Sequence, residues 1–331
     1  WNQVELDKRK YTKGWSPVEN TDFSLTEFGG ELDRYLESYD AIKKIVSEVE
    51  SVIPQGRKDA FFAQIKYPVF GAAAMSVKML EAQRARCIFP GSCDTTLWTR
   101  EDRLMAACAK SIRAYQEIRE LTDYYNNELA GGKWKYSMCH NPRDLYVFYP
   151  PTVPVWLTDN ELEKYASLDN PVSLPLEEAA KDSCIVSNAC AYSKASEGVE
   201  IIQSLGHSMN AVSLPKGQTI TFEFESLWEG EAVLRTAVIP TQPNDKGDIR
   251  FCVSIDGEAS RVCSFKEGFR TEAWKQNVLR GQAVRNTEHT LTKGRHTLSI
   301  TALDDHVLID QWMIDFKPER AFYVFPVNPV Y

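Results

Sequence analysis

Apolar residues recur at intervals of three and four along the first third of the chain. The first series follows Ser24-Leu25-Thr26-Glu27, where a hydroxyl residue precedes a carboxylate by three positions, the pattern of a capping box at a helix N-terminus. Its apolar members share one face of a helix: Leu32, Tyr35, Leu36, Tyr39, Ile42, Ile45, Val46, Val49 and Ile53. The spacing predicts an amphipathic helix that ends near Pro54.

Two further helical stretches follow. One runs from Arg57 to about Arg86, and we expect a break or kink after Tyr67 because Pro68 lacks a backbone N–H. The other begins behind Thr99 and stops at Gly131-Gly132, which can adopt a left-handed cap. Its core stripe consists of Leu104, Met105, Cys108, Ile112, Tyr115, Ile118, Leu121 and Tyr125. We predict a helical bundle over residues 24–149, preceded by a connecting arm over residues 1–23.

The pattern changes between residues 150 and 180. Prolines at positions 150, 151, 154, 171 and 175 prevent long regular elements, and only residues 161–166 suit a short helix. We interpret this segment as a proline-rich linker.

Beyond it, apolar and polar residues alternate in short runs separated by Gly, Asp and Lys. The runs cover residues 185–186, 198–204, 211–214, 218–224, 231–238, 249–255, 272–278, 294–300 and 307–316. Alternation with period two predicts short antiparallel strands. The fold class is therefore an α+β multidomain protein, with a C-terminal antiparallel β-sandwich over residues 181–331. By resemblance, and not from this pattern, the sandwich is similar to a carbohydrate-binding module.

Composition narrows the functional classes. The 331 residues are 43% hydrophobic and carry a net charge of −8. A nucleic-acid partner or an anionic membrane surface is not expected, because phosphate binding needs clustered Lys and Arg, and the longest basic run is Lys8-Arg9-Lys10. No apolar run approaches the ~20 residues of a membrane span. The 8 Trp and 14 Tyr residues suit stacking on sugars, although an aromatic core would give the same count.

The chain starts at Trp1, without a signal-peptide pattern, so we expect a segment of a longer protein.

The 8 cysteines include three pairs that are close in sequence: Cys87 with Cys93, Cys184 with Cys190, and Cys252 with Cys263. Short-loop disulfides in an oxidising compartment and buried free thiols explain them equally well. Cys87 and Cys93 flank a turn-rich loop and are the best disulfide candidates.

No catalytic or metal-binding motif is present in the sequence. Gly206-His207-Ser208-Met209-Asn210 is the nearest approach to a nucleophile elbow, but it lacks the second Gly and is better explained as a loop. Asp245-Lys246-Gly247-Asp248 and Asp304-Asp305 resemble calcium loops in composition only and predict turns. No metal or cofactor is expected.

His289 and His296, seven residues apart, would lie on opposite faces of one strand. Glu223 and Glu225 share a strand face, and solvent exposure explains them without catalysis.

Three residues are candidates for ligand contact. Lys133 and Trp134 follow a helix end, where side chains can project into a groove, although Trp134 would more often plug the end of the bundle. Trp274 lies among charged residues and is expected to be an exposed ring, whereas Trp312 is expected in the core.

Short runs spread along the chain carry a family resemblance: Trp1-Asn2-Gln3-Val4-Glu5, Asp59-Ala60-Phe61-Phe62, Tyr67-Pro68-Val69, Gly132-Lys133-Trp134, Val253-Ser254-Ile255-Asp256, Trp274-Lys275-Gln276-Asn277-Val278 and Gly294-Arg295-His296-Thr297-Leu298. With the order of bundle, linker and sandwich, they make nearly the whole chain similar to the C-terminal region of glycoside hydrolase family 115, the xylan α-1,2-glucuronidases.

The resemblance implies a non-catalytic role. In that family an N-terminal α/β domain and a (β/α)-barrel build the catalytic pocket, so no catalytic residue is assigned here. The family removes (4-O-methyl)glucuronic acid from xylan with inversion. It implies secretion to the periplasm or medium, packing against upstream catalytic domains of the same polypeptide, homodimer formation and binding of glucuronoxylan.

Two other functions fit the same residues. A free-standing carbohydrate-binding or adhesion protein predicts xylan binding that weakens when Trp274 or Trp134 becomes Ala. A structural scaffold predicts no sugar binding at all.

Overall fold

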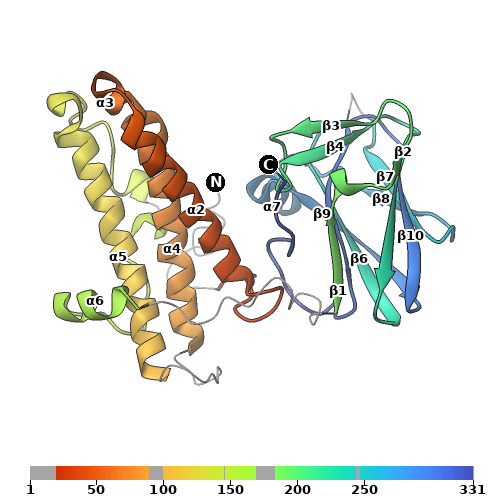
Figure 1. Cartoon of the computed structure of the whole chain (residues 1–331), viewed down its shortest axis with the longest axis horizontal. Helices are drawn as coiled ribbons and strands as arrows, with labels where there is room; N and C mark the ends of the chain where they lie inside the picture. The colour runs from red at the N-terminus through yellow and green to blue at the C-terminus, as the bar shows by residue number, and fades with distance from the viewer. Residues whose placement is uncertain (1–19, 89–99, 145, 169–182, 244–246, 331) are drawn as a thin grey trace. The chain divides into compact units, whose positions relative to one another are not determined.

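The structure is a computed structural model in which residues 20–88, 100–144, 146–168, 183–243 and 247–330 are described. The chain forms two compact units (Figure 1). The helical unit comprises residues 1–26 and 30–174, and the sandwich comprises residues 27–29 and 175–331. The predicted fold class, a helical region followed by an antiparallel β-sandwich, is confirmed.

The first helix, α2 (Glu31–Val52), starts later than its sequence pattern predicts. Phe28, Gly29 and Gly30 have left-handed φ values of 55°, 69° and 67°, which end any helical path through them. The predicted capping box at Ser24–Glu27 is therefore wrong. Instead, the Glu31 carboxylate accepts a hydrogen bond from the Ser24 backbone N–H at 2.7 Å, so a residue of the first turn satisfies a donor of the preceding turn.

The second helical stretch continues through the position where a break was expected. A 3₁₀ turn (Gln55–Arg57) and α3 (Lys58–Phe61) lead into a π-helical segment (Phe62–Lys66), which is followed directly by α4 (Tyr67–Ile88). Pro68 removes a backbone donor, and a π-helical turn is one way that a helix accommodates such an irregularity. The irregularity thus precedes Tyr67, and the chain stays helical.

The third helix, α5 (Arg100–Asn127), is followed by a 3₁₀ turn (Leu129–Gly132). Ala130, Gly131 and Gly132 there have positive φ values, as the two glycines predict. Two more 3₁₀ turns (Pro142–Asp144 and Tyr146–Phe148) precede α6 (Asp159–Ala166). Leu162 and Tyr165 of α6 pack on small α5 residues such as Ala107 and Cys108. None of the helices among the described residues has the length and apolarity to cross a membrane.

The sandwich consists of two antiparallel sheets (Figure 1). The first has the order β3-β4-β11-β6-β9, with β1 also paired to β11, and the second has the order β2-β5-β10-β7-β8. The strands of the first sheet are β1 (Cys184–Asn188), β3 (Glu200–Gln203), β4 (Asn210–Leu214), β6 (Gly230–Val238), β9 (Ala283–Leu291) and β11 (Val307–Asp315). Those of the second are β2 (Lys194–Ala195), β5 (Thr219–Ser226), β7 (Arg250–Ile255), β8 (Arg261–Ser264) and β10 (Gly294–Ala302). A 3₁₀ turn (Ala189–Ala191) follows β1.

The core lies between the two sheets and is centred on Trp312, which is 2% exposed. Its ring meets that of Phe222 in an edge-on arrangement, with the centroids 5.3 Å apart. Alternate residues of β7 and β10 face the same core, as period-two patterning requires. The prediction that Trp312 is a core residue is confirmed.

Residues 272–278, expected as a strand, form α7 (Glu272–Arg280). Thr271 caps this helix by accepting a hydrogen bond from the Trp274 backbone N–H at 3.2 Å, and Gly281 closes it with a φ of 74°. Trp274 and Val278 are four residues apart, a spacing that places both on one side of a helix. Leu279 is buried. The strand prediction for this segment is wrong. The alternation covers only seven residues, which is a weak strand signal, whereas Thr271 and Gly281 provide both ends of a helix.

Candidate functional site

The sandwich carries an aromatic patch that we call the Phe269–Trp274 patch, made of Phe269, Arg270 and Trp274. The loop before α7 holds Phe269 75% exposed, and α7 supplies Trp274, which is half-buried. The two ring centroids lie 5.2 Å apart with an interplanar angle of 68°. The Arg270 guanidinium lies 5.2 Å from the Phe269 ring centroid. Trp274 is therefore less exposed than its charged neighbours suggested, and its exposed partner is Phe269.

These three side chains suit a sugar. An aromatic ring offers a flat apolar surface to the C–H face of a pyranose, and an arginine can bind a carboxylate or hydroxyl beside it. Among the described residues of the sandwich, the other large exposed apolar side chains are aliphatic: Ile201, Leu227, Val262, Val278 and Val330. Sequence reasoning missed Phe269 and Arg270, although an aromatic residue between Gly268 and the helix cap Thr271 signals an exposed turn.

Lys133 and Trp134 lie in the helical unit, in the loop that follows α5. Trp134 is 40% exposed, so it does not plug the end of the bundle. The Lys133 ammonium lies 5.0 Å from the centroid of the Trp134 ring. The two sequence candidates are thus neighbours on the surface, and Tyr136, which the sequence did not single out, is 87% exposed beside them.

The segment Gly206–Asn210 contains no active nucleophile. Ser208 is fully buried, and its hydroxyl donates to the Asp310 carboxylate at 2.5 Å. The adjacent His207 directs Nε2 to the backbone carbonyl of Arg280 at 2.8 Å rather than to Ser208. Burial lowers the pKa of His207. Residues 206–209 lie between β3 and β4, which confirms the predicted loop for them, whereas Asn210 begins β4. The polar groups of His207 and Ser208 bind Asp310.

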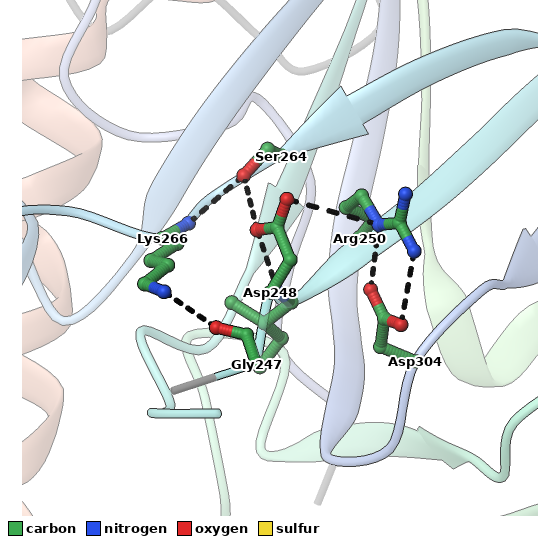
Figure 2. A network of polar contacts seen from close by, with 7 residues as sticks. Gly247, Asp248, Arg250, Ser264, Lys266 and Asp304 are labelled. Carbon is green, nitrogen blue, oxygen red and sulfur yellow. Dashed lines mark hydrogen bonds and ion pairs between the residues drawn. The ribbon is translucent and has the colours of Figure 1, made fainter. Parts of the chain in front are cut away.

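Asp248 and Asp304, one from each of the two acidic segments, lie on either side of Arg250 (Figure 2). Asp245 and Lys246 lie outside the described residues, so the turn expected there stays a prediction. The Arg250 guanidinium donates to Asp304 at 2.8 and 3.2 Å, and its Nε lies 3.8 Å from an oxygen of Asp248. Hydrogen bonds from Ser264 and the Ile249 backbone N–H lower the pKa of Asp248, and those from Arg250 lower the pKa of Asp304. In the part of the chain that the structure describes, no three His, Cys, Asp or Glu residues are placed to hold a metal ion.

His289 and His296 lie on β9 and β10, in different sheets, and both are buried. His289 Nδ1 is 2.5 Å from Glu258, and its Nε2 is 2.8 Å from the Thr287 hydroxyl. His296 Nδ1 is 2.6 Å from Asp256, and its Nε2 is 2.8 Å from the Thr292 carbonyl. A hydroxyl can donate to a neutral ring, whereas a carbonyl only accepts, so the partners of His296 favour the doubly protonated ring.

The pKa values follow these partners. Burial lowers the pKa of His289 in spite of Glu258. For His296, burial acts in the same direction, but the hydrogen bonds to Asp256 and Thr292 and the Asp256 charge outweigh it and raise the pKa. A His with a raised folded-state pKa stabilises the fold below its unfolded pKa of about 6.5, and this contribution disappears as pH rises through the folded-state value.

We therefore expect the stability advantage of the wild type over His296→Gln to shrink as pH rises from about 6 to about 8.5. Thermal unfolding of both proteins across this range measures the difference. His289→Gln is the control, since a lowered pKa makes the His289 contribution decline as pH falls instead. A His296 advantage that grows with pH would contradict the assignment.

The cysteine predictions have mixed outcomes. Cys93 lies outside the described residues, so the Cys87–Cys93 pairing stays a prediction. Cys263 pairs with Phe251 across the sheet and Cys252 with Val262, so the two cysteines point to opposite faces of β7 and β8. They are free thiols, and burial raises the pKa of Cys263.

Glu223 and Glu225 are both exposed on one face of β5, as predicted, opposite Thr297 and Arg295 of β10. They border an open hollow of about 490 Å³. The hollow is lined mainly by polar and charged side chains, including Arg295 and Thr297.

Comparison with known proteins relates nearly the whole chain to one solved enzyme and the sandwich to one family of domains. The solved structure of BtGH115A, a family GH115 4-O-methyl-α-glucuronidase with specificity for decorated arabinogalactans, is 28% identical, with a TM-score of 0.70 over 95% of this chain and 37% of that one. Nearly the whole chain is thus similar to a region of a glycoside hydrolase. Residues 178–328 match the glycosyl hydrolase family 115 C-terminal domain, so the sandwich is such a domain. The predicted resemblance is confirmed.

Other matches cover less of the chain. A family 35 carbohydrate-binding module from Clostridium thermocellum is 15% identical, with a TM-score of 0.31 over 40% of this chain and 98% of that one. A Podospora anserina mannanase with a family 35 module is 17% identical, with a TM-score of 0.32 over 40% of this chain and 28% of that one. No curated protein sequence matches the chain. The chain corresponds to 37% of the length of BtGH115A.

Proposed function

We propose that this chain is the non-catalytic C-terminal part of a secreted 4-O-methyl-α-glucuronidase and that its sandwich holds the polysaccharide substrate. The family 115 domain at residues 178–328 is the observation that carries the proposal. Because BtGH115A acts on decorated arabinogalactans and the sequence resemblance points to xylan, we take glucuronoxylan as the first substrate to test and arabinogalactan as the second.

The Phe269–Trp274 patch is the proposed polysaccharide contact. The Phe269 ring is exposed to solvent and packs edge-on against the Trp274 ring, with the two centroids 5.2 Å apart. The Thr271 cap fixes the start of α7, which carries Trp274. A ring that is already held in place loses little conformational entropy on binding. The patch therefore supports stacking of a pyranose on Phe269, with Arg270 at its edge.

Replacing Phe269 or Trp274 by Ala is expected to weaken binding of glucuronoxylan by about two- to tenfold, the usual contribution of an aromatic contact. Affinity electrophoresis or isothermal titration calorimetry measures the change. Leu227→Ala is the matched control, because Leu227 is an aliphatic side chain of the sandwich that is 63% exposed. Unchanged affinity in both aromatic variants would rule out the patch.

The remaining roles follow from the same proposal. Catalysis comes from upstream domains of the same polypeptide, so the 331-residue chain alone is expected to release no glucuronic acid from glucuronoxylan. A longer protein that contains those domains is expected to release it. Release by this chain alone would overturn the non-catalytic assignment. Homodimer formation and a periplasmic or extracellular location complete the proposal, to be tested by sedimentation and by cell fractionation.

A further inference from the structure

The loop after α5 is held in one conformation by its backbone. Ala130, Gly131, Gly132 and Tyr136 have left-handed φ values between 51° and 78°. The Asn126 side chain bonds both the N–H and the carbonyl of Met138 at 2.9 Å, as a neighbouring strand would. Hydrogen bonds from Lys135 N to Gly132 O and from Ser137 N to Trp134 O close the turns between them at 3.2 and 2.9 Å.

This loop presents two rings, each paired with a lysine. The Lys133 ammonium lies 5.0 Å from the Trp134 centroid, and the Lys135 ammonium lies 5.4 Å from the Tyr136 centroid. Trp134 is 40% exposed and Tyr136 is 87% exposed. Within the described residues, Lys133 and Lys135 form no ion pair with a carboxylate, so their charges stay available to a ligand. We call these four residues the Lys133–Tyr136 loop.

A groove adjoins the loop. Ser137 and Met138, which follow Tyr136 directly, line a cavity of about 450 Å³ together with Tyr67, Met75, Leu121 and Phe148. Its volume falls within the range of ordinary ligand sites, and its lining is mainly apolar. The residues that directly follow the two rings in the chain thus form part of a concave surface.

We propose that the Lys133–Tyr136 loop binds a polysaccharide that carries uronic acid side chains. The rings offer flat apolar faces to pyranose C–H groups, and the ammonium beside each ring is placed to meet a carboxylate on the same sugar. The net charge of −8 disfavours an anionic polymer overall, and the two lysines beside the exposed rings supply the local positive charge that such a polymer needs. The site lies in the helical unit and stands whether or not the Phe269–Trp274 patch binds sugar.

A matched pair of polymers tests the charge requirement. We would measure the affinity of the 331-residue chain for glucuronoxylan and for the same polymer after its carboxyl groups are reduced to alcohols. All measurements are repeated in a Trp274→Ala background, in which binding at the sandwich is expected to be weaker, so that the loop accounts for more of the measured affinity. The loop is expected to prefer glucuronoxylan, and this preference is expected to disappear at high salt.

Two variants separate the ring from the charge. Lys133→Met is expected to weaken glucuronoxylan binding by about two- to fivefold, as for an exposed ion pair, and to leave binding of the reduced polymer unchanged. Trp134→Ala is expected to weaken binding of both polymers by about two- to tenfold. The controls are Lys44→Met, an exposed lysine of α2, and Trp156→Ala, a tryptophan that is 58% exposed.

Three results would overturn the proposal. They are equal affinity for the native and reduced polymers in the Trp274→Ala background, a Lys133→Met variant that behaves like Lys44→Met, and the absence of polysaccharide binding in that background. Circular dichroism of each variant checks that the helices are intact.

Discussion

Asp310→Ala is expected to destabilise the sandwich by about 3–5 kcal/mol, which is a large fraction of the stability of a typical domain. The Asp310 carboxylate is fully buried. It accepts hydrogen bonds from the backbone N–H of His207 at 2.8 Å, from Ser208 N–H and hydroxyl at 3.1 and 2.5 Å, and from the Gln282 amide at 2.6 Å. Alanine leaves these buried donors without their acceptor, and each unsatisfied group costs about 1–3 kcal/mol.

A double-mutant cycle tests the geometry around this carboxylate. Gly206 has a φ of 78°, and a Cβ added there would overlap the Asp310 carboxylate. Gly206→Ala should therefore cost more than Gly217→Ala, whose φ is 80° but whose Cβ would meet nothing within 4 Å. In the Asp310→Ala background the overlap is removed, so the extra cost of Gly206→Ala should fall toward that of Gly217→Ala.

Hydrogen exchange of peptides from β11 and β6, measured by mass spectrometry, reports the sandwich separately from the helical unit. If Asp310→Ala changed the opening free energy of these strands by less than about 1 kcal/mol, the carboxylate would not have the anchoring role described. Because His207 also contacts the Arg280 carbonyl at the end of α7, we expect a loosened α7 in this variant and, with it, weaker sugar binding at the Phe269–Trp274 patch.

Arg84→Met is expected to have a comparable effect on the helical unit, also about 3–5 kcal/mol. The Arg84 guanidinium binds Asp33 of α2 through both terminal nitrogens and Glu81 of α4 through Nε at 3.0 Å. The three side chains are only 10%, 9% and 3% exposed. Burial alone would lower the pKa of Arg84, but the two carboxylates outweigh it and raise the pKa. Methionine retains much of the side-chain volume but removes the cation that both carboxylates contact.

The pH dependence distinguishes lost charge from lost packing. Without Arg84, the two largely buried carboxylates of Asp33 and Glu81 lose the cation that lies between them, and a buried charge that has lost its partner is costly. Low pH reduces this cost because it favours the uncharged carboxyl form. The deficit of Arg84→Met should therefore shrink as pH falls from about 7 to about 5. Arg84→Lys retains the charge but loses the bidentate contact with Asp33. Its stability should therefore lie between that of the wild type and that of Arg84→Met.

Urea unfolding of the helical unit, followed by hydrogen exchange of α2 and α4 peptides, measures these differences. Arg113→Met serves as the control, because Arg113 is exposed on α5 and donates a hydrogen bond to the uncharged Gln116. A pH-independent deficit for Arg84→Met would indicate that Arg84 acts through packing and not through its charge.

The candidate surfaces could be predicted in part. The sequence placed Trp134 beside Lys133 after a helix end and placed Trp274 among charged residues, and both lie at surfaces rich in aromatic rings. It did not distinguish a ring that fills the core from one that faces solvent, since the same residue types serve both purposes. The contact between the exposed Phe269 ring and Trp274 could not be predicted from the sequence, because residues 272–278 were expected to form a strand and form α7 instead.

Where a long apolar pattern exists, the sequence alone predicts whether the segment is a helix or a strand. Periodicity of three and four over more than twenty residues set α2, α4 and α5, and alternation placed Trp312 in the core of the sandwich. These features are local, because they depend only on which side of an element must be buried.

Contacts between residues that are far apart in the chain could not be predicted from local patterns. β9 is polar on much of both faces and became a strand by pairing with β6 at the sheet edge, a role that no alternation signals. Ser208 and Asp310 are hydrogen-bonded although 102 positions separate them in the sequence. Arg84 binds Asp33, which is 51 positions away. A buried charge needs partners that complete its hydrogen bonds, and the fold selects them from distant parts of the chain.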